Sequence, residues 1–149
     1  MNETTPKTIN VIDVIQNDHR EIEALLARVA YPSNSTRGEA FDELAEHLAK
    51  HEAAEQAVVR PEIAKIDRTE GASREAEEAT ADGMLARLRS MDIEHAEFNP
   101  LFEKFRDAVL NHASHEETEE HTKLEANLDP ARLEDMGNEF VQAEQDAQR

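Results

Sequence analysis

The sequence contains no cysteine. Disulfides, thiolate catalysis, zinc fingers and cysteine-ligated iron–sulfur clusters are therefore excluded. Tryptophan is also absent, and the 149 residues include only four glycines and one tyrosine. No apolar run approaches the length of a membrane span, and the N-terminus lacks the basic start and apolar core of a secretory signal. These absences predict a cytoplasmic protein with no membrane partner.

Positive charge is scarce in this chain. It has 16 Lys and Arg residues against 34 Asp and Glu residues, which gives a formal net charge of -18. Nucleic acids and anionic membranes both require a positive surface, so the composition disfavours either partner. The sequence also lacks a Ser-His-Asp arrangement and a phosphate-binding glycine loop, which disfavours hydrolases and nucleotide-binding proteins. A protein partner is not indicated.

The abundant residues favour α-helix. The chain is rich in Ala, Glu and Leu, which are good helix formers, and no stretch alternates in the manner of a strand. Apolar residues recur by threes and fours in five segments, over about 9–30, 38–66, 73–91, 100–127 and from 130 onward. We therefore predict an all-α protein, an antiparallel up-down-up-down four-helix bundle with a short fifth C-terminal helix.

Proline, glycine and capping residues suggest the boundaries of these helices. Pro61 predicts a kink or an early end in the second helix, and Ser73 is a plausible N-cap for the third, after a polar loop over 67–72. Asn99 and Pro100 together predict the start of the fourth helix. Residues 1–8 are expected to be a disordered lead, 9–128 the bundle, and 129–149 the C-terminal helix and tail.

Two segments carry a histidine followed four residues later by a glutamate: His51 with Glu55, and His112 with Glu116. Residues spaced by four lie on the same face of a helix. In both segments the apolar stripe runs directly into this pair, so the pair stands where core residues are expected. A buried carboxylate without a partner is costly, and a cation is therefore indicated as the partner.

His19 and Glu78 also occupy apolar positions in their helices, which gives one candidate set drawn from four helices. Its members are His19, His51, Glu55, Glu78, His112 and Glu116. Imidazole and carboxylate donors suit iron or manganese better than calcium, and six ligands exceed the need of one tetrahedral zinc. Two octahedral ions, bridged by carboxylates and a small oxygen ligand, would use the set well.

The ordered set of motifs resembles the hemerythrin-like (HHE cation-binding) domain over about residues 11–125. The resemblance is carried by Val14-Ile-Gln-Asn-Asp18-His19-Arg-Glu-Ile22, His51-x-x-x-Glu55 with Pro61 beyond it, and His112-x-x-x-Glu116-Glu117. It implies a four-helix bundle that holds two non-haem iron ions (Fe²⁺/Fe³⁺), oxo- or hydroxo-bridged. It places His19, His51, Glu55, His112 and Glu116 at ligand positions.

The activities that the resemblance implies are O₂ binding, iron or oxygen sensing, and reaction with peroxide or nitric oxide. The small ligand would bind in a dry pocket lined by residues such as Ile22, Leu48, Leu85 and Val109. An enzyme of this kind would be catalase-like or another di-iron oxidoreductase, with His47 or His115 available as a proton relay. Whether the protein is an enzyme, and what its physiological ligand is, stay open at this point.

The third helix departs from the family pattern, which has at least one histidine there. Aligning Leu85 and Leu88 with the family places Glu78 at that position, with Asp82 four residues later. Glu78, Asp82 or neither replaces the histidine, and in the last case only one metal would bind well.

Two other functions remain compatible with the residues. One is an iron-storage or iron-sensing module that folds on binding metal. The other is a metal-free helical interaction domain, in which each His–Glu pair is hydrogen-bonded on a solvated face. Whichever function holds, we expect a mostly solvent-exposed helix face to carry His121, Glu119 and most of the acidic run over 116–120.

Overall fold

The computed structural model describes residues 10–31 and 36–147, so the predicted N-terminal lead lies outside the described residues. Helices make up almost all of these two ranges, and neither range contains a strand. In chain order the elements are α1 (Val11–Ala30), α2 (Arg37–Ala54), the π-helix η1 (Glu55–Val59), α3 (Arg60–Ile66), α4 (Arg68–Arg89), α5 (Phe98–His115), the π-helix η2 (Glu116–Glu120), α6 (His121–Asn127) and α7 (Pro130–Ala147). Among these helices, none has the length and apolar character needed to cross a membrane.

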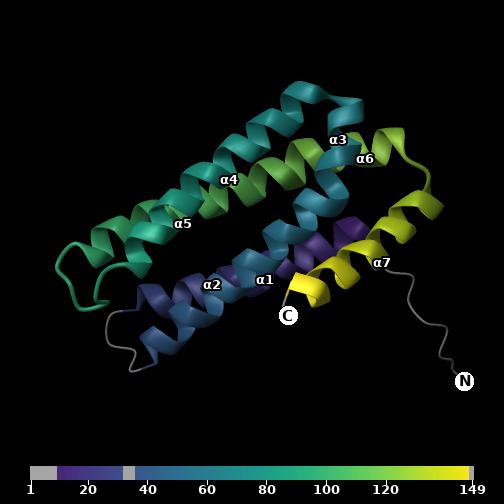
Figure 1. The fold of residues 1–149 in the computed structure, drawn as a ribbon. Coiled ribbons are helices and arrows are strands. Elements are labelled where there is room, and N and C mark those ends of the chain that lie inside the picture. Colours follow the sequence, from purple (N-terminus) through teal and green to yellow (C-terminus); the bar gives the residue numbers. More distant parts are fainter. Residues whose placement is uncertain (1–9, 32–35, 148–149) are drawn as a thin grey trace, which may run out of the picture.

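The elements form four antiparallel rods and a fifth helix (Figure 1). Two of the rods are continuous through a π-helix: α2, η1 and α3 form one, and α5, η2 and α6 form the other. α1 packs against α2, α4 packs against α5, and α7 lies along α1 and α2. The predicted all-α four-helix bundle with a C-terminal helix is confirmed, and α7 has the same 18-residue length as α2.

The third rod begins earlier than the sequence suggested. The predicted loop over 67–72 is wrong, because Asp67 caps α4 by accepting a hydrogen bond from the Glu70 N–H at 3.2 Å. Ser73 therefore lies inside the helix. Gly71 allows the tight turn between α3 and α4, since a Cβ there would stand only 3.3 Å from Cγ2 of Ile63.

The start of α5 and the end of the second rod also differ from the sequence prediction. Asn99 does not cap α5, which begins at Phe98; its side-chain oxygen instead accepts a hydrogen bond from Arg37 at 2.6 Å. Of the two outcomes expected at Pro61, the early end is wrong, because the second rod continues to Ile66. The π-turn of η1 ends at Val59, two residues before Pro61. Proline has no backbone N–H, so the regular series of α-helical hydrogen bonds is interrupted at Pro61.

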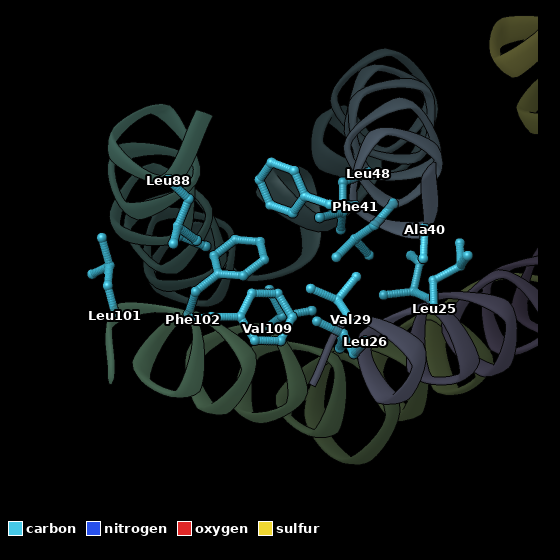
Figure 2. Close-up of a cluster of buried hydrophobic side chains, with 14 of the residues drawn as sticks. Leu25, Leu26, Val29, Ala40, Phe41, Leu48, Leu88, Leu101, Phe102 and Val109 are labelled. Carbon is cyan, nitrogen blue, oxygen red and sulfur yellow. The ribbon is translucent and has the colours of Figure 1, made fainter. Parts of the chain in front are cut away.

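The interior of the bundle consists of two apolar clusters. One, shown in Figure 2, includes Ile22, Leu48, Ala81, Phe102 and Val109. The other lies toward the opposite end and includes Ile15, Val58, Ile63, Leu124 and Phe140. Along each continuous rod the two clusters are separated by a short polar stretch. The bundle therefore has a polar layer across its middle, with apolar packing on both sides.

Both π-helices begin at the glutamate of a His-x-x-x-Glu pair. Each inserts one extra residue into its turn, so that the N–H of Arg60 donates to Glu55 and the N–H of His121 donates to Glu116, in each case across five residues. The residue five positions after the glutamate is thereby turned toward the core: Arg60 is 5% exposed and His121 is 2% exposed. The expectation that His121 lies on a solvated face is wrong for this reason.

Phe102 lies in the first cluster (Figure 2), where it is buried, stacked on Phe98 and adjacent to Phe105. We expect Phe102→Ala to lower the free energy of unfolding by about 3–5 kcal/mol, because a buried aromatic leaves a cavity that the helices cannot close. Leu110→Ala is the matched control on the same helix, since Leu110 is 36% exposed. Urea denaturation measures both, and equal losses in the two variants would contradict this packing.

His121 is buried with no hydrogen-bond partner on either ring nitrogen. Burial lowers its pKa to about 4, against an ordinary value near 6.5. The folded state thus favours the neutral ring, and stability is lost as the pH falls from about 6.5 toward 4. Relative to His121→Leu, which cannot titrate, the wild-type protein should lose on the order of 3 kcal/mol across this window. Denaturation midpoints of the two proteins that stay parallel from pH 7 to pH 4 would refute the assignment.

Candidate metal centre

The structure brings the six candidate ligands together in the polar layer. They fall into two groups whose donor atoms lie within 4.8 Å of one another, one made of His19, His51, Glu55 and Glu116, and the other of Glu55, Glu78, His112 and Glu116. Glu55 and Glu116 belong to both groups. Both are 0% exposed, so each carboxylate is wholly inside the protein.

Each of the three histidines is oriented by a carboxylate behind it. The Nδ1 atoms face Glu117 at 2.6 Å for His19, Asp18 at 2.7 Å for His51, and Glu77 at 2.8 Å for His112. A carboxylate at Nδ1 fixes the tautomer and directs Nε2 the other way, as in many metal sites. The three Nε2 atoms accordingly face the centre, where that of His19 lies 3.0 Å from Glu116.

Several polar atoms at the centre are buried without a hydrogen bond. They are Nε2 of His51, Nε2 of His112 and both carboxylate oxygens of Glu55. Burying a polar atom without a hydrogen-bond partner costs free energy, and native proteins rarely contain such unpaired atoms. Here four such atoms belong to residues of the two groups. A cation that accepts their lone pairs would satisfy them, so the donor set fits a metal.

Protons are distributed unevenly over the metal-free centre. Burial raises the pKa of Glu55 well above its ordinary value, and the charge of Glu116 raises it further. Burial opposes the ionised form of Glu116, but its interactions with the adjacent side chains of Glu55, His112 and His19 outweigh burial and hold its pKa well below normal. Burial also opposes protonation of His112, yet the nearby carboxylates of Glu116 and Glu78 raise its pKa to about 12. Metal binding at this centre would therefore release protons.

Two charged residues in the layer, Arg60 and Glu120, were missed from the sequence. Nη1 of Arg60 donates to Glu120 at 2.8 Å, and Nη2 donates to Glu78 at 2.6 Å and to Glu116 at 3.2 Å. On a regular helix the face chosen by Glu55 and Glu116 would continue at steps of three and four. Glu120 lies four residues after Glu116 and follows that rule, whereas Arg60 lies five residues after Glu55 and is buried because of the extra residue in the π-turn.

The remaining candidates lie outside both groups. Asp82 is exposed and pairs with Glu52, whose pKa is raised to about 9 by burial and by that hydrogen bond. Of the two candidates on α4 for the position of the family's histidine, Glu78 therefore faces the layer. His47 stands 3.8 Å from Glu21, and His115 shares Glu77 with His112. Neither histidine takes part in a candidate ligand group among the described residues.

A small cavity of about 30 Å³ opens beside the ligands. This volume accommodates a water-sized molecule. Its apolar wall includes Ile22, Leu48, Ala81 and Val109. The expected apolar lining is thus present, except that Leu85 packs against the first cluster instead.

Comparison with known proteins agrees with this arrangement. The family model for the hemerythrin HHE cation-binding domain matches residues 10–124. The fold is similar to the crystal structure of a hemerythrin HHE cation binding domain-containing protein, the Rv2633c homolog from Mycobacterium kansasii, with a TM-score of 0.84 and 20% sequence identity. That match covers 93% of this chain and 87% of the other. No curated protein sequence matches the chain. The chain belongs to the hemerythrin HHE cation-binding domain family, which makes it a cation-binding helical protein.

Proposed function

We propose that this protein is a hemerythrin-like non-haem di-iron protein that binds O₂ or reacts with peroxide or nitric oxide. The observation that carries the proposal is that the two ligand groups share Glu55 and Glu116. A carboxylate has two oxygens, so one that belongs to two neighbouring groups can bridge two ions. His19 and His51 complete one half of the centre, and Glu78 and His112 complete the other.

The chemistry of the donors supports iron. All ligands are imidazole nitrogens and carboxylate oxygens, because the chain has no cysteine. Such a set suits iron or manganese, and di-iron carboxylate proteins build their sites from similar residues inside helical bundles. The carboxylates behind the three imidazoles support the same proposal, since they raise ligand basicity and fix each ring.

The structure favours this proposal over a metal-free scaffold. In a scaffold, each His–Glu pair would be closed by its own hydrogen bond. Instead Nε2 of His51 lies 3.4 Å from Glu55 without a hydrogen bond. Leaving these buried groups unsatisfied costs stability that a bound cation would restore.

The protein's own residues hold and shield the reacting molecule. When bound, an iron pair supplies redox-active positions at which a small oxidant or nitric oxide can bind. Leu48 and Val109 form part of the apolar wall of the cavity, whose volume of about 30 Å³ fits only a small molecule. Glu117, Asp18 and Glu77 keep the three imidazoles directed inward. This selection by size is consistent with O₂, peroxide and nitric oxide as a class.

The test is metal analysis and visible spectroscopy of aerobically purified protein. We expect about two irons per chain, as in di-iron carboxylate bundles, and near-ultraviolet charge-transfer absorption. Glu116→Gln should lose most of the iron and the absorption, because it removes a charge from both halves of the centre. Glu119→Gln, a neighbouring exposed acid on the same rod, should keep both. Wild-type protein with less than one iron per chain, or with zinc alone, would refute the proposal.

The same samples separate the possible reactions. A carrier should show a reversible spectral change with O₂ and no turnover of peroxide. An enzyme should remove peroxide or nitric oxide in proportion to its iron, and Glu116→Gln should reduce that rate together with the iron content. An iron-loaded protein that does neither, but whose melting temperature rises strongly with iron, would point to storage or sensing.

A further inference from the structure

We infer that Arg60 is a permanent cation of the metal centre, which makes its two halves unequal. In this inference, which rests on the proposed di-iron function, the half formed by His19, His51, Glu55 and Glu116 binds its ion tightly. The half formed by Glu55, Glu78, His112 and Glu116 binds its ion more weakly, because that ion competes with the guanidinium of Arg60.

The contacts of Arg60 place it against the second half. Its Nη2 lies 2.6 Å from Oε2 of Glu78 and 3.2 Å from Oε2 of Glu116. These two oxygens are the same ones that face Nε2 of His112, at 3.3 Å and 3.2 Å. In this half, two of the three carboxylates therefore already have one oxygen in contact with the fixed positive charge of Arg60.

The first half is much less affected. Apart from its contact with the shared Glu116, Arg60 approaches this half through Oε1 of Glu55, at 3.8 Å. Glu116 faces His19 through Oε1, the oxygen that Arg60 does not contact. An ion bound between His19 and His51 would meet carboxylate oxygens that accept no hydrogen bond from Arg60. An ion beside His112 would meet oxygens that already accept hydrogen bonds from Nη2.

The charges around Arg60 explain why a cation is built into the protein. Four buried carboxylates surround it: Glu55, Glu78, Glu116 and Glu120. Arginine stays protonated under all ordinary conditions and its planar group can serve several carboxylates at once. Glu120 belongs to neither ligand group and is held by Nη1 alone. The arginine therefore stabilises these acids when the second half holds no ion.

The test is anaerobic titration of metal-free protein with Fe²⁺, followed by calorimetry and by bound iron per chain. Wild-type protein should bind a first ion at least about tenfold more tightly than a second, since a nearby unit charge in the interior is worth that much or more. Arg60→Gln should tighten the second ion by about tenfold and leave the first within about threefold. Arg37→Gln is the control, because Arg37 is also buried but contacts Val29 and Asn99, far from the centre.

A second variant guards against loss of folding, since removing one partner of a buried ion pair is destabilising. Arg60→Gln combined with Glu120→Gln removes the cation and one surrounding acid together, and should show the same tighter second ion. Circular dichroism checks that each variant is folded. Two ions of equal affinity in wild-type protein, or a second ion that weakens when Arg60 is replaced, would overturn the inference while leaving the di-iron proposal intact. No Fe²⁺ binding at all would instead remove the di-iron proposal itself.

Discussion

Buried acidic groups at the centre of an apolar bundle are the constraint on which this structure depends. Glu55, Glu78, Glu116 and Glu120 all lie between two hydrophobic clusters, with almost no contact with solvent. Charges in such a place are stable only when positive groups or protons surround them. The imidazoles, the guanidinium of Arg60 and the raised pKa of Glu55 all meet that need. A metal would meet it more completely, since it would replace protons with a larger positive charge.

The two π-helices are the backbone feature that helps to build this buried polar layer. A π-turn is rare and is often found at functional sites, because it is less favourable than an α-turn and needs compensation. Here both occur directly at the glutamates that the two ligand groups share. Each lets the residue five positions later face inward, so that one rod contributes Arg60 and the other contributes His121. The irregular turns thus add polar groups to the layer that a regular helix would have directed to solvent.

The same turns mark the limit of what the sequence could predict. The bundle and the six candidate ligands follow from apolar steps of three and four, which hold along the regular parts of the rods. Arg60 and His121 could not be found in this way, because the inserted residue of each π-turn buries the side chain five positions after the glutamate. Glu120 lies four residues after Glu116, an ordinary helical step, and was missed because it stands in an acidic run that is typical of a solvated face. The start of α4 was missed for another reason: Asp67 offers a better cap than Ser73, and Gly71 packs inside the helix against Ile63.

The centre also depends on a helix beyond the family match, which ends at residue 124. Phe140 of α7 places its ring edge-on to the imidazole of His51, with centroids 5.6 Å apart. Glu144, one turn further along α7, joins Asp18 and His51 in a third cluster of potential donors. Asp18 in turn accepts the Nδ1 hydrogen bond that orients His51. The candidate ligand His51 is therefore packed by α7 and oriented from α1, so the fifth helix takes part in the structure of the candidate centre although it lies outside the matched segment.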